Sequence, residues 1–192
     1  MKKQILIAAA ALAASAVPAF AHLDPMAHGS LMAGLSHPLF GGDHIVAMLA
    51  VGLWAGEIGG RARWAVPAAF VATMAIGFAL AVIGVGLPFV EPAVLASVIA
   101  LGLIVAIAVR LDATKAAAIV AIFALFHGHA HGGELGAAGA LPFAAGFIIA
   151  TALLHVAGIV FGMALARLSG GGSLARLLGG ITALAGAALM LG

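Results

Sequence analysis

Long apolar stretches fill most of this chain, and short charged or Gly/Pro-rich segments separate them. Each stretch is a continuous run rich in Ala, Leu, Ile and Val, and a helix needs about 20 such residues to cross a bilayer. Six of these stretches follow one another, over residues 29–56, 64–86, 93–109, 116–131, 140–166 and 174–191. The pattern predicts six transmembrane helices joined by short loops, one of which covers residues 132–139.

A separate and shorter apolar run at the N-terminus has the features of a secretory signal peptide. Two lysines begin it, an apolar segment too short to span comfortably continues to Val17, and Ala19-Phe20-Ala21 is a small-x-small cleavage site. We therefore predict a cleavable signal peptide over residues 1–21 and a single six-helix transmembrane domain over residues 22–192. The alternative is an uncleaved first helix.

The composition supports a membrane location. Hydrophobic residues make up 65% of the chain and charged residues only 7%, whereas soluble domains carry about 25% charged residues. The fold class is therefore an all-α membrane protein that has the lipid bilayer as its partner. Small residues such as those of Gly158-x-x-x-Gly162 are expected to mediate the helix contacts. The absence of cysteine excludes disulfides and thiolate metal sites, and the few basic residues do not indicate nucleic-acid binding.

The basic residues beyond the signal peptide gather in alternate loops. These loops follow the first, third and fifth predicted helices and contain Arg61, Arg63, Arg110, Lys115, Arg167 and Arg176. The positive-inside rule assigns such loops to the cytoplasm. Because an exported N-terminus and an even number of spans agree with this assignment, both termini of the mature chain are predicted to lie outside the cytoplasm.

The stretch His37-Pro38-Leu39-Phe40-Gly41-Gly42-Asp43-His44 is unusual within an apolar region, because ionisable side chains and broken backbone are costly in a membrane. Its proline and glycines predict that the first helix is broken near Pro38, Gly41 and Gly42, with Asp43 capping the helix that runs on from His44. His37, Asp43 and His44 offer nitrogen and oxygen ligands that suit nickel, cobalt or zinc. The alternative is that the histidines are buried and bonded to backbone carbonyls.

A second cluster, Phe126-His127-Gly128-His129-Ala130-His131-Gly132-Gly133-Glu134, ends the fourth predicted helix. In a continuous helix, His127, His131 and Glu134 would share one face, whereas His129 would point away from it. The glycines weaken the helix here, so its continuation stays open. These three histidines and Glu134 are candidate metal ligands, and the alternative is a solvated, histidine-rich loop end.

Three more histidines are weaker candidates for the same site. His155 lies near the middle of the fifth span, where it could serve as a ligand or bond a carbonyl of a neighbouring helix. His22 and His28 precede the first span and could collect cations outside the cytoplasm, although short exported tails often contain such residues by chance. No protease, hydrolase or phosphate-loop motif is present, so ATP-driven pumping by this chain alone is not indicated.

With these two motifs the chain resembles the HupE/UreJ family of hydrogenase and urease accessory membrane proteins. A signal peptide, six spans and a histidine in the fifth span fit the same resemblance. The resemblance implies a protein of the bacterial inner membrane that imports nickel, or cobalt, into the cytoplasm by secondary transport for metalloenzyme maturation. It also implies that the family's motif residues correspond here to His37, Asp43, His44, His127, His131 and Glu134.

The leading hypothesis is therefore a divalent-cation permease and not an enzyme. The nickel or cobalt ion is its substrate, and no prosthetic group is expected. An intramembrane metal-dependent hydrolase is the alternative, because three histidines, an aspartate and a bound water also describe a catalytic zinc site with an open position. A metal-binding accessory subunit that buffers or signals without transport is a third possibility, and a homo-oligomer stays open.

Overall fold

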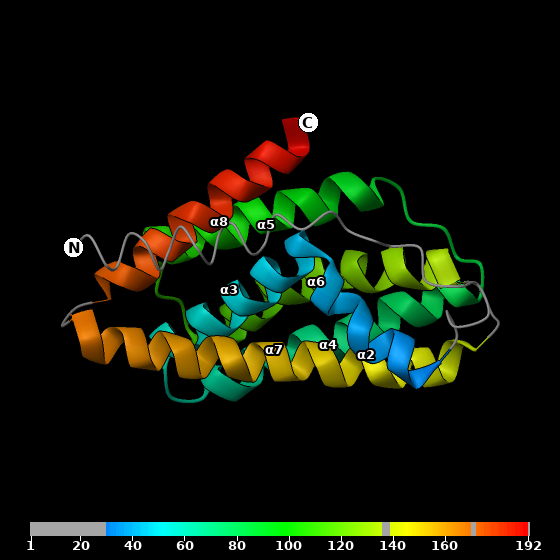
Figure 1. The fold of residues 1–192 in the computed structure, drawn as a ribbon, viewed down its shortest axis with the longest axis horizontal. Helices are drawn as coiled ribbons and strands as arrows, with labels where there is room; N and C mark the ends of the chain where they lie inside the picture. The colour runs from blue at the N-terminus through cyan, green and yellow to red at the C-terminus, as the bar shows by residue number, and fades with distance from the viewer. Residues whose placement is uncertain (1–29, 136–138, 170–171, 192) are drawn as a thin grey trace.

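The computed structural model describes residues 30–135, 139–169 and 172–191, and in these residues it contains helices and no strands (Figure 1). The helices are α2 (Leu31–Phe40), α3 (Gly42–Ile58), α4 (Ala62–Val82), α5 (Val90–Ala106), α6 (Ala113–Leu135), α7 (Ala140–Ser169) and α8 (Ser173–Leu191). The predicted all-α class is confirmed. The predicted signal peptide, together with His22 and His28, lies outside the described residues.

The helices are those of a multi-pass membrane protein. Four of them, α4, α6, α7 and α8, are long and apolar enough to cross a bilayer, and α2 and α3 together qualify as one bent span. α5 is apolar but shorter, with 17 residues. Each predicted stretch corresponds to one helix, except that the first corresponds to the pair α2 and α3. The count of six spans, and the orientation of the termini, stay predictions.

The first predicted span is broken at Gly41. α2 ends at Phe40, Gly41 has extended backbone, and α3 leaves at 85° to α2. This confirms the predicted break. The predicted cap is wrong, because Gly41 is the N-cap of α3 and Asp43 lies in the first turn. The carboxylate of Asp43 instead accepts a hydrogen bond from the imidazole of His44, at 2.9 Å between Oδ1 and Nδ1.

The loop predicted over residues 132–139 begins too early, because α6 continues to Leu135. Gly128 and Gly132 lie against α4, where an added methyl group would overlap the backbone carbonyls of Met74 and Phe78. These glycines therefore form the surface on which α4 and α6 pack, and the packing offsets their weak helix propensity. As a result, the second histidine cluster lies on one continuous helix.

Glycine contacts recur in the four most extensive helix pairs, α4–α6, α5–α8, α3–α7 and α2–α7. In each pair, two glycines bring the backbones so close that a Cβ on either would meet main-chain atoms of the other helix. The pairs of glycines are Gly77 and Gly128, Gly102 and Gly179, Gly52 and Gly158, and Gly34 and Gly146. The expectation that small residues mediate the contacts is confirmed, including the role of Gly158.

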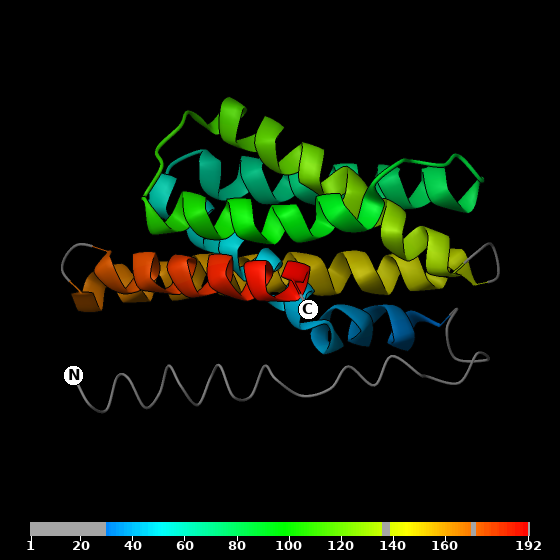
Figure 2. The ribbon, with the colours of Figure 1, turned by 90° about the horizontal axis from the view of Figure 1, so that it is seen from above.

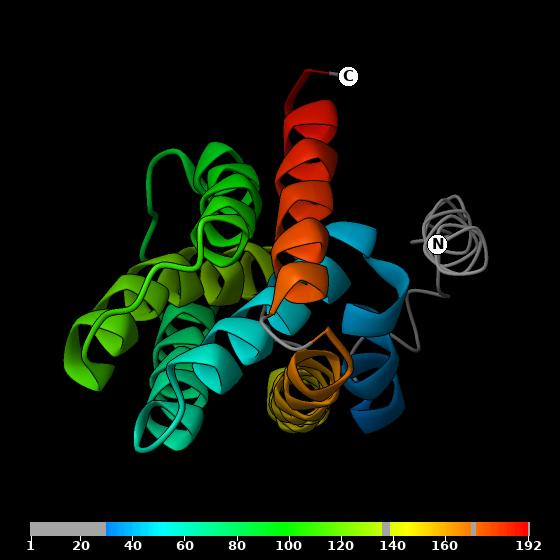
Figure 3. The same cartoon turned by 90° about the vertical axis from the view of Figure 1, so that its left-hand side faces the viewer.

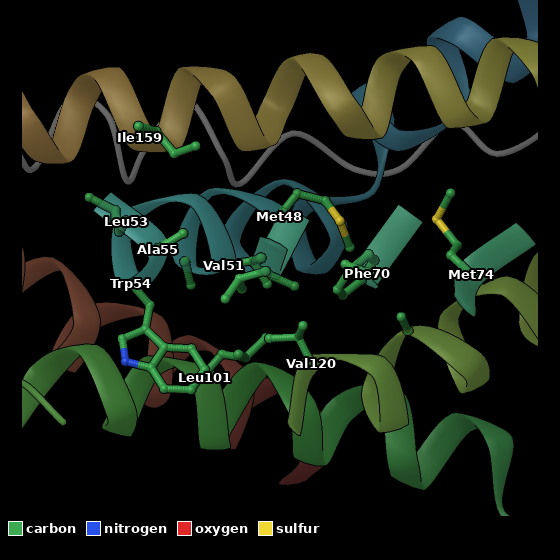
Figure 4. Close-up of a cluster of buried hydrophobic side chains, with 14 of the residues drawn as sticks. Met48, Val51, Leu53, Trp54, Ala55, Phe70, Met74, Leu101, Val120 and Ile159 are labelled. Carbon is green, nitrogen blue, oxygen red and sulfur yellow. The ribbon is translucent and has the colours of Figure 1, made fainter. Parts of the chain in front are cut away.

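α3 is the central helix of the bundle. Figure 2 shows α4, α5 and α6 on one side and α7 and α8 on the other, and the end-on view of Figure 3 places α3 between them. In Figure 4, Met48, Val51 and Trp54 lie between Ile159 of α7 and a layer that contains Leu101 and Val120. The indole of Trp54 is fully buried and donates a hydrogen bond to the carbonyl of Val109, at 2.7 Å.

Two adjacent glycines of α8 allow a direct test of this packing. Gly179→Ala would drive a methyl group into the backbone of α5, whereas Gly180 has open space around it. We expect Gly179→Ala to destabilise the protein by about 1–3 kcal/mol through overpacking, seen as a lower thermal midpoint in detergent. Gly180→Ala should leave the midpoint unchanged or raise it, because alanine favours a helix by about 1 kcal/mol. Equal effects of both would contradict the assigned α5–α8 contact.

Candidate metal centre

The bend at Gly41 between α2 and α3, called the elbow below, brings the two predicted motifs together. His37 comes from the last turn of α2, and Asp43 and His44 come from the first turn of α3. His131 and Glu134 come from the end of α6, so the cluster joins residues about 90 positions apart in sequence. Because the elbow turns the chain by 85°, His37 and His44 approach His131 from two directions.

His131 is the centre of this cluster. Its Nδ1 lies 2.9 Å from Nε2 of His37, and its Nε2 lies 2.6 Å from Nε2 of His44. The rings are edge-on to each other, with centroids 4.6 Å apart for His37 and 4.5 Å apart for His44. Both nitrogens of one buried imidazole therefore face a nitrogen of another histidine, so the ring of His131 offers a pair of nitrogens on each of two sides.

With neutral imidazoles, the hydrogen bonds can run in only one direction through the cluster. Asp43 accepts the proton of His44 Nδ1, which leaves His44 Nε2 as an acceptor. His131 must then donate from Nε2 to His44, and His37 donates from Nε2 to Nδ1 of His131. An ion that binds between two of these rings needs a lone pair on both facing nitrogens, so the proton between them must move to the other nitrogen of its ring.

Glu134 brings a carboxylate to the outer side of the cluster. Its Oε2 lies 3.7 Å from Nδ1 of His131 and 4.0 Å from Nε2 of His37. The ligand atoms of His37, His131 and Glu134 all lie within 4.8 Å of one another, which is close enough to hold one ion. Two imidazoles and a carboxylate suit a divalent transition metal such as nickel, cobalt or zinc.

The exposed fraction of the side chains decreases from the outer to the inner side of the cluster. The side chain of Glu134 is 68% exposed and that of His37 is 33% exposed, whereas His131 is only 4% exposed. The rings of Phe143 and Phe147 pack against His37, and Phe147 also packs against His131. Apolar walls of this kind exclude water and strengthen electrostatic attraction between the ligands and a cation.

Further polar groups continue the cluster into the bundle. The ring of His127 lies edge-on to that of His44, with centroids 5.3 Å apart, and its Nε2 lies 2.8 Å from Oγ of Ser97 in α5. The ring of Phe70 contacts both His127 and the deeper His155, with centroids 5.8 Å and 4.9 Å away. These aromatic and imidazole rings form a chain from the elbow toward the bundle centre.

His155 lies well below the elbow. The backbone carbonyl of His155 faces Gly52, which is eight residues beyond His44 on α3 and therefore about 12 Å along its axis. Both ring nitrogens of His155, Nδ1 of His127 and Oγ1 of Thr151 are buried and make no hydrogen bond to the described residues. Buried polar atoms are ordinarily satisfied, so these atoms could accept or bind a ligand.

The structure distributes the predicted ligands over three places. His37, Asp43, His44, His131 and Glu134 form the cluster, and His127 adjoins it. His155 lies deeper, and His129 lies outside, where its Nε2 donates to the carbonyl of Val85 at 2.7 Å. Sequence reasoning missed Ser97 and Phe70. A lone serine in the middle of an apolar run was the available signal for Ser97, whereas nothing in the sequence distinguished Phe70 from an ordinary core residue.

The fold and the site define a multi-pass helical membrane protein with a histidine–carboxylate cluster at one end of its bundle. The family model described as HupE / UreJ protein matches residues 10–189, so the chain belongs to that family. A curated relative, Protein HupE of Rhizobium leguminosarum bv. viciae, is 50% identical over 184 residues, which cover 94% of this chain and 95% of the relative. No solved structure matches the chain.

Proposed function

We propose that this protein is a permease for a divalent transition-metal ion, with nickel first and cobalt second as substrate, that imports the ion for hydrogenase or urease maturation. The observation that carries the proposal is the position of His131, whose two nitrogens lie within 3 Å of His37 and His44 nitrogens beside two carboxylates. The membership of the chain in the HupE/UreJ family supports the same conclusion.

The decrease in side-chain exposure across the cluster suggests the order in which its residues bind the ion. Glu134 and His37 are the most exposed ligands and receive the ion, and His131 and His44 then hold it at the elbow. His127 and His155 offer the next nitrogens, one after the other, deeper in the bundle. The break at Gly41 is the natural hinge, because a change of the 85° angle there would separate His37 from His131.

The membrane potential can drive this movement without ATP. A divalent ion that moves inward gains about 2.3 kcal/mol per charge for each 100 mV, or about 4–5 kcal/mol in total. The gain is comparable to a thousandfold change in affinity. Release on the inner side therefore needs only a moderate weakening of the ligand set.

A metal-dependent hydrolase inside the membrane is less well supported. A hydrolytic site would close its ligands around one ion and keep an acid–base carboxylate beside a bound water. Here the polar groups instead extend from the elbow through His127 to His155, some 12 Å along α3. A string of ligands along a bundle serves passage of an ion better than catalysis at one point.

Flux measurements in proteoliposomes test the proposal. The purified protein is reconstituted with a metal-sensitive dye inside, and nickel, cobalt and zinc are added outside with an inside-negative potential. We expect rapid nickel entry that collapses in Asp43→Ala and His44→Ala variants that still insert, because these variants break the hydrogen-bonded chain at the elbow. Liposomes without protein give the background. Binding of nickel without flux would indicate an accessory metal-binding subunit, and undiminished flux in both variants would overturn the site.

A further inference from the structure

A cavity lined by arginines lies at the end of the bundle opposite the histidines. Its volume is about 450 Å³, and it opens where α3 and α7 end and α4 and α8 begin. Four arginines line it, each from a different segment: Arg63 of α4, Arg110 of the α5–α6 loop, Arg167 of α7 and Arg176 of α8. Glu57, near the end of α3, is the acidic residue of the lining.

The cavity carries an excess of positive charge that the lining itself does not balance. Four guanidinium groups face one carboxylate, and no ion pair within 4.0 Å joins Glu57 to any of them in the part of the chain that the structure describes. Nε of Arg63 and Oε2 of Glu57 are buried and have no hydrogen-bond partner among the described residues. Positive charges held together at the edge of a low-dielectric bundle repel one another, so an anion in the cavity would relieve this repulsion.

The positive-inside rule alone does not account for this convergence. That rule requires basic residues in cytoplasmic loops, and exposed residues such as Arg61 satisfy it without contributing to the cavity. Arg63, two positions later, is half-buried and lines the cavity together with the more exposed Arg110, Arg167 and Arg176. Segments that are far apart in sequence thus supply a shared set of donors, which is the mark of a binding site.

The guanidinium groups indicate a phosphate as the ligand. Arginine presents planar paired donors that match phosphate oxygens, and basic pockets at the cytoplasmic ends of transmembrane helices bind lipid head groups. The leucines that follow Arg167 and Arg176 in sequence are largely exposed, Leu168 at 79% and Leu177 at 57%. Apolar surface next to a phosphate site favours a ligand that also has hydrocarbon chains.

We infer that this cavity binds the phosphate group of an anionic phospholipid, with the acyl chains lying over the exposed leucines. The lipid is held by Arg63, Arg110, Arg167 and Arg176. The inference does not depend on the proposed metal transport, because the cavity and the histidine cluster lie at opposite ends of the bundle. Loss of lipid binding would leave the assignment of the metal site intact, and the converse also holds.

Lipid retention by the full-length protein tests the inference. The protein in uncharged detergent is titrated with phosphatidylglycerol, with phosphatidylcholine of the same chains, and with inorganic phosphate at constant ionic strength. Bound lipid is counted by native mass spectrometry, and the thermal midpoint is followed in parallel. We expect phosphatidylglycerol to be retained and to raise the midpoint, and phosphatidylcholine to do neither.

Charge-neutralising variants locate the binding. Arg63→Gln and Arg110→Gln should each weaken phosphatidylglycerol binding about fivefold, whereas Arg61→Gln, which removes the same charge outside the cavity, should not. Equal losses in all three variants, or equal binding of both lipids by the unaltered protein, would overturn the inference. If inorganic phosphate saturates the cavity and phosphatidylglycerol cannot displace it, the ligand is a free anion and not a lipid. The comparison of lipids on the unaltered protein decides the question even if a variant fails to fold.

Discussion

Replacing His131 by alanine is expected to weaken nickel binding by at least about a hundredfold and to abolish nickel uptake. Loss of a residue that only supports a metal ligand costs up to about a hundredfold, and His131 is itself the central ligand of the cluster. Its two nitrogens lie 2.9 Å from Nε2 of His37 and 2.6 Å from Nε2 of His44, so its removal also breaks the hydrogen-bonded link between these two rings. Isothermal titration of the purified protein with nickel measures the change directly.

His129→Ala is the matched control for this prediction. His129 lies two residues earlier on the same helix, and its ring bonds the carbonyl of Val85 outside the cluster. We expect nickel affinity to stay within about threefold of the unaltered protein, well below the loss for His131→Ala. If the two variants lost affinity equally, the cluster around His131 would not be the binding site.

Nickel affinity is also expected to fall steeply as the pH is lowered from about 7.5 to about 5.5, the range in which histidine ordinarily titrates. Nickel binds neutral imidazole, so each ligand that must first lose a proton can lower the apparent affinity by up to about tenfold per pH unit. His131 lies within hydrogen-bond distance of both His37 and His44, so a proton on one of these rings occupies a nitrogen that the ion needs. The neighbouring carboxylates of Asp43 and Glu134 and the ring of His127 face the same cluster.

Proton release measures the same coupling independently. Nickel added to weakly buffered protein should acidify the solution, and the number of protons released per ion should match the slope of log affinity against pH. Affinity that stays constant over this pH range would contradict the predicted competition between protons and nickel.

Much of the architecture could be predicted from the sequence because hydrophobicity in a membrane protein is a local property. Each predicted apolar stretch corresponds to a helix or, for residues 29–56, to the broken pair α2 and α3. Pro38 and the two glycines predicted the break, because those residues weaken a helix wherever they stand. The extent of α6 was not predictable in this way. Its glycines disfavour a helix locally, and only their contact with α4 stabilises it.

The candidate site, like the fold, could be predicted from the sequence only in part. Six of the ten predicted ligands form the cluster or adjoin it, because histidines and carboxylates in an apolar chain are costly enough to stand out individually. The position of His129 on the outside depends on where the α4–α5 loop passes. Ser97 stood out only as a polar residue in an apolar run, and Phe70 did not stand out at all, because each acquires its role here from the ring beside it.

By itself, the sequence determined that this chain is a helical membrane protein, where its helices lie and which side chains are too polar for lipid. These properties depend on composition and on spacing along one helix, and they need no knowledge of neighbours. Only the tertiary structure decided that an 85° elbow brings His37 and His44 to either side of His131, and that four distant arginines share a cavity at the other end. Contacts between residues so far apart in sequence depend on which glycine-faced helices pack together and at what angle. The packing of all the helices together determines both.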